Sequence, residues 1–182
     1  MREVEWVSIE LFDKNWNVLL IEEWENKSWK NKGQISTPMG TVEEEEKEKY
    51  LETLIRELEE EIWLILDNKD KEKIEENWEF VLYVEDKEKW KIKVFIKKFR
   101  LKIDDVLKEK IDLNLSNKEI TRVFWENKEN LKNENIENLR PWTVETLLKE
   151  KEEENKIWVV FIKNWKYHKN TYNWVKNDLQ NI

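Results

Sequence analysis

RELEEEIWL, residues 56–64, is the stretch that decides the fold. Its glutamates Glu57, Glu60 and Glu61 are spaced i, i+3 and i+4, so on a helix turning about 100° per residue they project from one side. Three carboxylates on one rigid element offer the hard oxygen ligands that Mg²⁺ and Mn²⁺ prefer. On a glutamate-rich helix, a solvated face is the simpler interpretation, so the flanking sequence has to decide between the two.

The pattern around this stretch predicts an amphipathic helix over residues 46–62. Its apolar residues recur at i, i+3, i+4, i+7 and i+11, and they are Leu51, Leu54, Ile55, Leu58 and Ile62. The carboxylates are offset from this stripe, so the stripe can anchor the helix while the carboxylates face a cleft. Like charges held together are unfavourable unless a cation neutralises them.

The same region resembles the Nudix box, whose core reads Arg-Glu-U-x-Glu-Glu-x-Gly-U with U aliphatic. Residues 56–64 fit every fixed position except the glycine, which here is Trp63. Upstream, the PMG of residues 38–40 is similar to the Pro-Gly-Gly that ends the family's lead-in strand. Glu48 takes the place of the first box glutamate if the loop is expanded by two residues. Glu46 keeps the loop length but breaks the helical spacing, so Glu48 is preferred.

The resemblance implies an α/β fold of the Nudix type, an α/β/α sandwich with a mixed central sheet, in a single domain over residues 1–182. It implies a metal-dependent pyrophosphohydrolase that cleaves a nucleoside diphosphate linked to another moiety: a nucleoside triphosphate, ADP-ribose, a dinucleotide or a nucleotide sugar. The expected cofactor is Mg²⁺ or Mn²⁺. The resemblance also leaves a homodimer possible.

Residue roles follow from the resemblance, position by position. The implied metal ligands are Glu57, Glu60 and Glu61, with the Gly40 carbonyl and Glu48 as further candidates. Arg56 is expected to orient the carboxylates by charge-assisted hydrogen bonds. Glu119 lies in a segment similar to one that follows the central strands in many members, and it is a candidate fourth ligand or general base.

Two other functions remain open. One is a non-catalytic Nudix-fold module that binds a nucleotide or a partner, which the altered residues 38–40 and the expanded loop allow. The intact Glu57, Glu60 and Glu61 argue against it. The other is an unrelated acidic interaction protein whose helix only mimics the box.

The composition limits the classes of partner and the location expected for this protein. The 182 residues carry a formal net charge of -8, which disfavours binding to duplex nucleic acid. There is no cysteine and no apolar run of about 20 residues, so neither a disulfide scaffold nor a membrane span is expected. The N-terminus is acidic and unlike a signal peptide, which favours a cytoplasmic protein. The single histidine, His168, is expected on the surface.

One cluster of basic residues has both a functional and a structural interpretation. It consists of Lys97, Lys98, Arg100 and Lys102. These cations could receive a substrate phosphate, but a solvated edge strand is the simpler interpretation.

Alternating and apolar runs predict the strands. They are expected at residues 4–12, 17–23, 79–84, 91–96, 99–103 and 119–124, with a C-terminal hairpin at 157–162 and 166–171. A weakly helical segment is expected at residues 128–138 and a helix from 141 to about 154.

The chain has 12 tryptophans and only 2 glycines. Asn-Trp occurs at Asn15-Trp16 and Asn164-Trp165 between strand-like runs, where Asn-Gly would form a type I′ turn. We therefore hypothesise that most of these tryptophans occupy glycine positions, as a UGA codon written as Trp but read as Gly would produce. At Trp63 we expect an indole to be crowded by the chain that turns out of the helix.

Overall fold

The computed structural model describes most of the chain up to residue 132 and parts of the remainder. The described residues are 2–23, 33–43, 49–86, 89–115, 117, 120–132, 139–140, 143, 147, 157–163 and 166–167. The strands are β1 (Arg2–Phe12), β2 (Asn17–Glu23), β3 (Ile35–Ser36), β4 (Met39–Thr41), β5 (Glu75–Asp86), β6 (Lys89–Lys102), β7 (Ile120–Asn127), β8 (Ile157–Lys163) and β9 (Lys166–Tyr167). The helices are α1 (Tyr50–Ile62), α2 (Asn68–Glu72), α3 (Asp105–Glu109) and α4 (Lys128–Lys132).

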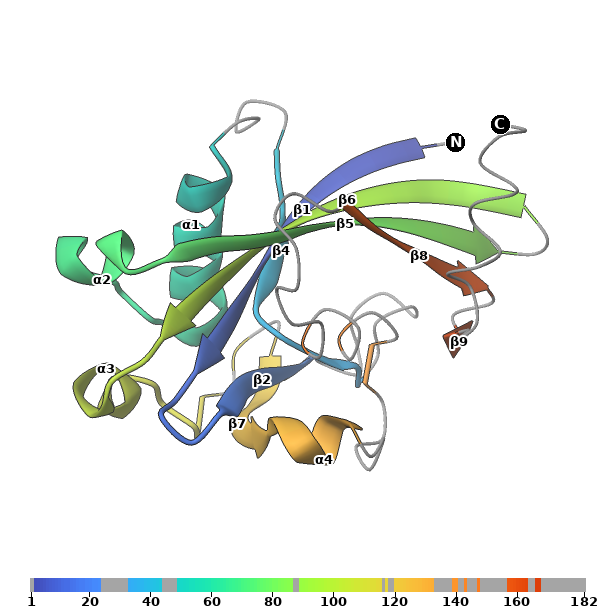
Figure 1. Cartoon of the computed structure of the whole chain (residues 1–182). Coiled ribbons are helices and arrows are strands. Elements are labelled where there is room, and N and C mark those ends of the chain that lie inside the picture. Colours follow the sequence, from blue (N-terminus) through green and yellow to red (C-terminus); the bar gives the residue numbers. More distant parts are fainter. Residues whose placement is uncertain are drawn as a thin grey trace.

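The strands form one mixed, strongly twisted sheet (Figure 1). Its order is β3-β2-β1-β6-β5-β8-β9, with β4 also paired to β1 and β7 also paired to β2. The pairs β1–β6 and β5–β8 are parallel and the remaining pairs antiparallel. The predicted strands are present wherever the structure describes them, although β5 begins at Glu75, four residues earlier than expected, and β6 continues without a break to Lys102. Residues 168–171 of the predicted hairpin, residues 133–138 and most of the helix predicted from 141 to about 154 lie outside the described residues.

Helices cover both faces of the sheet. Alternation along β1 directs Val7, Ile9 and Leu11 into a core cluster that also contains Leu54 and Leu58 of α1. A second cluster joins side chains of β2 and α4, namely Val18, Leu20 and Leu131. The predicted α/β/α layering is thus confirmed. The stripe on α1 is narrower than predicted, because Leu51 is 38% exposed.

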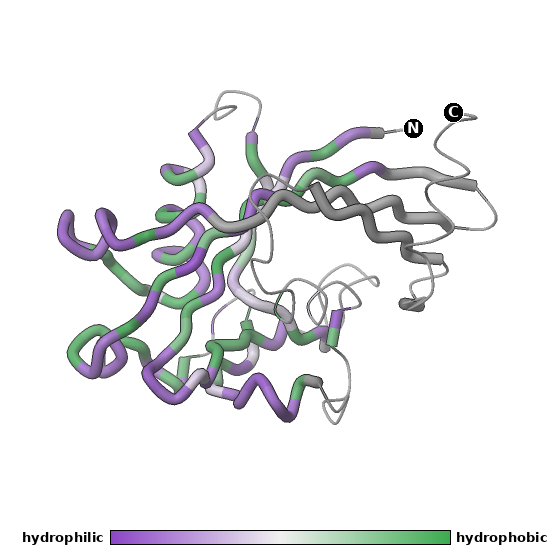
Figure 2. The backbone as a smooth tube through the Cα atoms, viewed as in Figure 1, coloured by the Kyte–Doolittle hydropathy of each residue, from purple (hydrophilic) through white to green (hydrophobic). Residues whose placement is uncertain are grey.

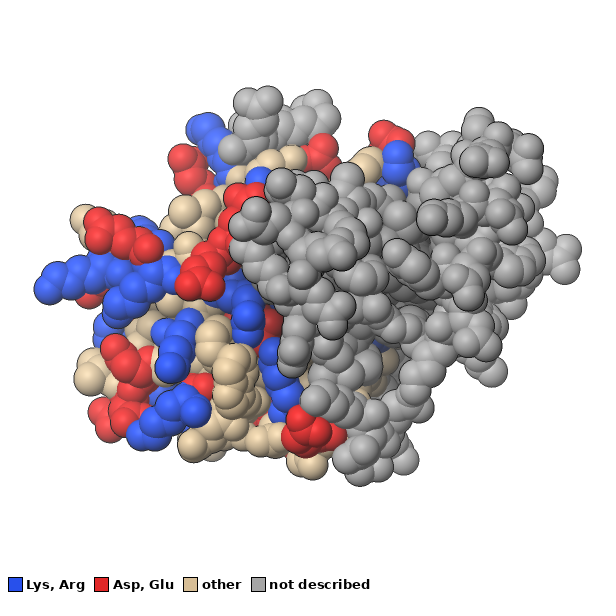
Figure 3. Space-filling view, viewed as in Figure 1, with Lys and Arg blue, Asp and Glu red and all other residues tan. Residues whose placement is uncertain are grey.

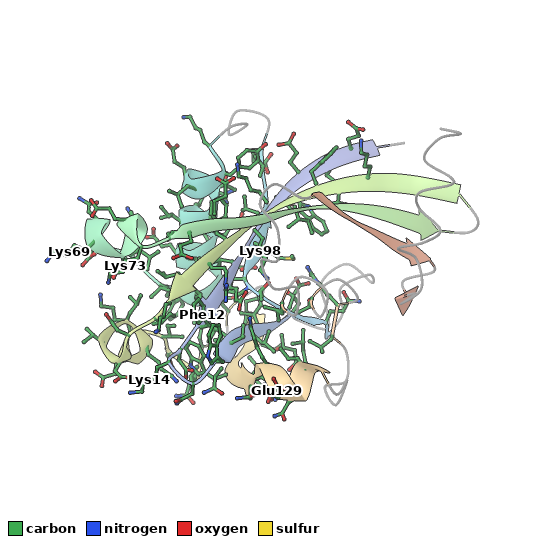
Figure 4. The ribbon with its side chains drawn as sticks, viewed as in Figure 1. Phe12, Lys14, Lys69, Lys73, Lys98 and Glu129 are labelled. Carbon is green, nitrogen blue, oxygen red and sulfur yellow. The ribbon has the colours of Figure 1, made fainter. Side chains whose placement is uncertain are left out.

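The prediction that the basic cluster lies on a solvated edge strand was wrong. β6 lies between β1 and β5, and Lys98 is only 1% exposed, in the middle of the fold (Figure 4). Its ammonium lies 3.2 Å from the Glu10 carboxylate, which also contacts Arg100 and Lys128. Burial lowers the pKa of Lys98 to about 8, even though Glu10 opposes that shift. Lys98 therefore stabilises a buried carboxylate instead of presenting a charge to solvent.

Two tryptophans adopt a backbone conformation that favours glycine. Among the described residues, Trp16 (φ 61°) and Trp63 (φ 55°) are the ones other than glycine with positive φ. Trp16 closes the β1–β2 turn, where Asp13 accepts hydrogen bonds from the backbone of Asn15 and Asn17. Trp78 lies where the β5–β6 register shifts, between Glu76 and Glu79, and such bulges often contain glycine.

The crowding expected at Trp63 is absent. Trp63 is 60% exposed, so the space around its side chain is not overfilled. The unfavourable free energy at this residue comes instead from its left-handed backbone conformation. Its amide donates to the Glu59 carbonyl, which is the bond of the αL C-cap motif, and the Leu64 amide donates to the Leu58 carbonyl. Glycine is the usual residue at that position of the motif.

On the face seen in Figure 3, many charged side chains lie on the described residues. Hydrophilic residues occupy the outer turns of α2 (Figure 2), and Lys and Arg mix with Asp and Glu around α2 and α3 (Figure 3). No helix in the described part is long and apolar enough to cross a bilayer.

Candidate active site

The helix α1 and the short strand β4 form the candidate site together. β4 is held against β1, with Met39 opposite Ser8 and Gly40 opposite Val7. The buried stripe of α1 packs on the same strand, β1. The two elements that carry the predicted ligands are therefore fixed to one support, and the polar side of α1 faces Met39 and Gly40.

Glu57 lies directly over Gly40. A Cβ atom on residue 40 would come within 2.0 Å of the Glu57 Cδ and 2.3 Å of its Oε1, closer than atoms can approach. Glycine is thus required at residue 40 for Glu57 to keep its place. The Glu57 side chain is largely buried, so this contact also directs its carboxylate.

Glu61 is buried beside Glu57. Its side chain is 5% exposed, and its Oε2 accepts a hydrogen bond of 3.1 Å from the Met39 amide. Burial first, and then the negative charge of Glu57, raise the pKa of Glu61 well above its usual range. The Met39 amide and Arg140 oppose this shift, and a cation bound beside Glu61 would lower its pKa further.

Arg56 and Glu60 form the exposed side of the same cluster. The Arg56 guanidinium lies 3.0 Å from Glu57 Oε1 and 3.1 Å from Glu60 Oε2. Glu60 is 61% exposed and does not join Glu57 and Glu61. Within the described residues no three acidic or histidine side chains converge as a metal site would require. Glu48, Glu46, Glu119 and His168 lie outside the described residues.

Asn117 ties the segment before β7 to the end of α1. Its side-chain amide donates to the Glu61 carbonyl at 3.0 Å and the Glu60 carbonyl at 3.4 Å, while its Oδ1 accepts from the Ile120 amide at 2.8 Å. Sequence reasoning missed this role, because asparagine is common throughout the chain. The described residues that flank position 119 thus lie close to the carboxylate helix.

A buried ion pair, Glu23–Arg140, was also missed. Arg140 bonds to the Glu23 carboxylate and to the Met39 sulfur, and its own amide donates to the Ile35 carbonyl at 2.9 Å. Met39 in turn donates to Glu61. Glu23 is the last residue of β2 and directly follows Glu22, so the sequence gave no signal that one of these two charges would be buried.

A hollow of about 620 Å³ lies elsewhere, at the ends of β1 and β6, where Figure 4 labels Phe12, Lys14 and Lys73. None of the predicted ligands lines it. Two of its cations are paired locally, with Lys14 2.9 Å from Asp105 and Lys73 3.9 Å from Asp104. It is therefore separate from the carboxylate site.

The sequence matches a family model described as NUDIX domain over residues 1–159. No curated protein matches it. Among solved structures, a MutT protein from Bacillus halodurans superimposes with a TM-score of 0.61 at 14% identity, covering 90% of this chain and 94% of that one. A MutT protein from Methanosarcina mazei Go1 gives 0.59 at 21% identity, covering 84% and 97%.

A third solved structure contains a bound ligand. The NUDIX domain of NrtR from Shewanella oneidensis, in a cocrystal with ADP ribose, gives a TM-score of 0.52 at 16% identity. The superposition covers 73% of this chain and 78% of that one. At these identities the structural likenesses show the fold, which is the α/β/α sandwich described above.

Proposed function

Because the chain belongs to the Nudix family, as the match over residues 1–159 shows, we propose that it is a metal-dependent pyrophosphohydrolase. Family members are generally hydrolases of pyrophosphate bonds. The proposed substrate is a nucleoside diphosphate linked to a further group, handled by one domain over residues 1–182. The ADP ribose bound by the NrtR domain supports a nucleotide-derived ligand.

The observation that carries this proposal is that the carboxylates of Glu57 and Glu61 lie close together. One carboxylate is set over Gly40 and the other on the Met39 amide, and both are largely shielded from water. Two carboxylates so placed repel each other. A protein that maintains such repulsion in a rigid frame gains from it only when a cation binds there.

The available donors fit a hard divalent ion. Glu57 and Glu61 would hold Mg²⁺ or Mn²⁺, and Glu60 would join them by leaving Arg56, which its exposed position permits. The Gly40 carbonyl and Glu48 are the remaining proposed ligands. When bound, the ion would neutralise the diphosphate and favour an ionised water at neutral pH.

The chain's own residues supply the remaining requirements. Hydrolysis forms a bond between the water oxygen and phosphorus and breaks one phosphoanhydride P–O bond, so a base has to accept the water's proton. We assign this role to the carboxylate of Glu119, since Asn117 and Ile120 lie beside the end of α1. Arg56 keeps Glu57 and Glu60 oriented until a ligand arrives.

A substrate screen tests the proposal. Nucleoside triphosphates, ADP-ribose, NADH, dinucleoside polyphosphates and nucleotide sugars are incubated with the protein in Mg²⁺ or in EDTA, and the products are identified by mass. We expect at least one substrate to be cleaved at a phosphoanhydride bond in Mg²⁺ only. Tight binding of a nucleotide with no turnover of any substrate would instead identify a binding module.

A further inference from the structure

Buried acceptor atoms without partners gather next to the carboxylate site. In the described part of the chain, Glu23 Oε2, Ser36 Oγ and Gln34 Oε1 are buried and have no hydrogen-bond partner. A buried polar atom left unpaired is destabilising, and most such atoms in proteins are paired. Three in one place therefore indicate a position that a polar ligand satisfies.

The pairing of β2 with β3 places these atoms together. Ser36 is opposite Ile21, whose side chain belongs to the core cluster under α1, so Ser36 points to the same side of the sheet. Gln34 is two residues before Ser36, and its carbonyl accepts from the Glu23 amide at 3.0 Å. The three side chains thus surround the end of β2 where it meets β3.

Arg140 connects this end of β2 to the proposed catalytic carboxylates. Its guanidinium bonds Glu23 Oε1 and contacts the Met39 sulfur, and the Met39 amide bonds Glu61. Two residues, Arg140 and Met39, therefore link Glu23 to Glu61 of the carboxylate pair. Because Oε1 is engaged by Arg140, the orientation of the carboxylate is fixed and Oε2 is the oxygen left for a ligand.

We propose that Glu23 and Ser36 determine specificity by accepting a hydrogen bond from a donor group of the substrate, in the part that lies beyond its diphosphate. This inference rests on the proposed function. Glu23 is a pure acceptor when ionised, so its free oxygen favours N–H or O–H groups over carbonyl oxygens, and the Ser36 hydroxyl can accept beside it. The donor is either an amino group of a nucleobase or a hydroxyl of a sugar.

Binding measurements with matched ligands test the proposal. The ligands are nucleoside triphosphates with a methylene bridge between the α and β phosphorus atoms, titrated calorimetrically in Mg²⁺. Guanosine and inosine forms differ only in the 2-amino group, adenosine and inosine forms differ at position 6 of the base, and ribose and 2′-deoxyribose forms differ in one hydroxyl. We expect the wild-type protein to prefer the donor-bearing member of at least one pair by about tenfold.

Two variants and one control test whether that preference depends on Glu23 and Ser36. In Glu23→Gln, the amide oxygen stays with Arg140, so an NH₂ group replaces the free acceptor and the preference falls to within about twofold. Ser36→Ala should weaken the same preference, and it serves as the second test if Glu23→Gln does not fold. Glu22→Gln is the matched control, since Glu22 is the adjacent residue and pairs with Arg122 at 2.9 Å.

The outcomes separate this proposal from the proposed function. Loss of a preference in the Glu23 and Ser36 variants, but not in Glu22→Gln, supports the proposal and identifies the donor by the pair affected. An unchanged preference in both variants, or no preference in the wild type, overturns it. If Glu23→Gln hydrolyses a substrate with unaltered selectivity, the proposed enzymatic function stands and the specificity role of Glu23 is rejected. If the wild type binds selectively but hydrolyses nothing, the specificity role stands and the enzymatic function is rejected.

Discussion

Glu57 occupies the space that a side chain on Gly40 would need, with only 2.0 Å between the Glu57 Cδ and an ideal Cβ at residue 40. This contact couples the strand β4, upstream of α1, to the orientation of a carboxylate on that helix. Since β4 is fixed to β1, the helix side chain and not the strand has to yield when residue 40 becomes larger.

Gly40→Ala should therefore displace Glu57 and reduce kcat by at least about tenfold, because a ligand misplaced by about 1 Å can cost a hundredfold. Folding should survive, since the displaced group is a side chain. Steady-state kinetics and a thermal unfolding curve measure the two effects. Thr41→Ala, at the adjacent exposed position, is the control, and equal activity of the two variants would show that the contact is unimportant.

Trp63→Gly should stabilise the protein by about 1 kcal/mol, because the left-handed backbone is unfavourable for any side chain with a Cβ. The side chain is exposed, so little packing is lost. Urea unfolding measures the change. Trp125→Gly is the contrast: Trp125 lies within β7 and packs on the main core, and its loss should destabilise by roughly 3 kcal/mol or more.

The same comparison bears on how the gene is decoded. Trp16 and Trp63 both have positive φ, as Gly33 does, whereas Trp125 lies in a regular strand. Peptide mass spectrometry of the protein from its source should find glycine at residues 16 and 63. Tryptophan at either position would reject the decoding hypothesis there, whatever the stability of the variants.

Glu61 should make the metal-free protein less stable as pH rises. Its folded-state pKa is raised, so the folded state binds the proton more tightly than the unfolded state does. The stabilisation is complete below the unfolded pKa and is lost as pH rises through the folded pKa. We expect Glu61→Gln to gain stability relative to wild type in EDTA as pH increases, measured by urea unfolding. A difference independent of pH would contradict this.

Asp13 should have the opposite effect on the pH dependence of stability, stabilising the protein as pH rises. Burial would raise its pKa, but the Lys108 ammonium at 2.6 Å and the Asn17 hydrogen bonds outweigh it and lower the pKa to about 2. Its contribution is therefore present above the unfolded pKa and lost as pH falls through about 2. Asp13→Asn should be less stable than wild type at neutral pH, and the difference should shrink in acid. Urea unfolding across this pH range measures the difference, and a difference that stays constant would reject the assignment.

Local patterns predicted much of this molecule. The alternation in β1 and the stripe on α1 are properties of neighbouring residues, and both appear as predicted apart from Leu51. The box pattern assigned Glu57 and Gly40 to one site, but their direct contact is seen only in the structure. The resemblance supplied the layer order, which no local period contains.

The long-range polar contacts were not predictable from spacing. Arg140 reaches Glu23 across 117 positions, and Asn117 reaches Glu61 across 56. Lys98 seemed exposed because lysine usually is, yet the parallel pairing of β1 with β6 buries it beside Glu10. Such contacts depend on the strand order and not on the residues around each partner.

The most direct test of the central claim compares Glu57→Gln with Glu59→Gln in Mg²⁺-dependent hydrolysis of the best substrate from the screen. Both changes remove one negative charge from α1, but Glu59 is exposed and lies two residues, about 200° of helical turn, from Glu57. The metal-site assignment predicts that kcat falls by at least about a hundredfold in Glu57→Gln and stays within about twofold of wild type in Glu59→Gln. Equal kcat in the two variants would contradict it.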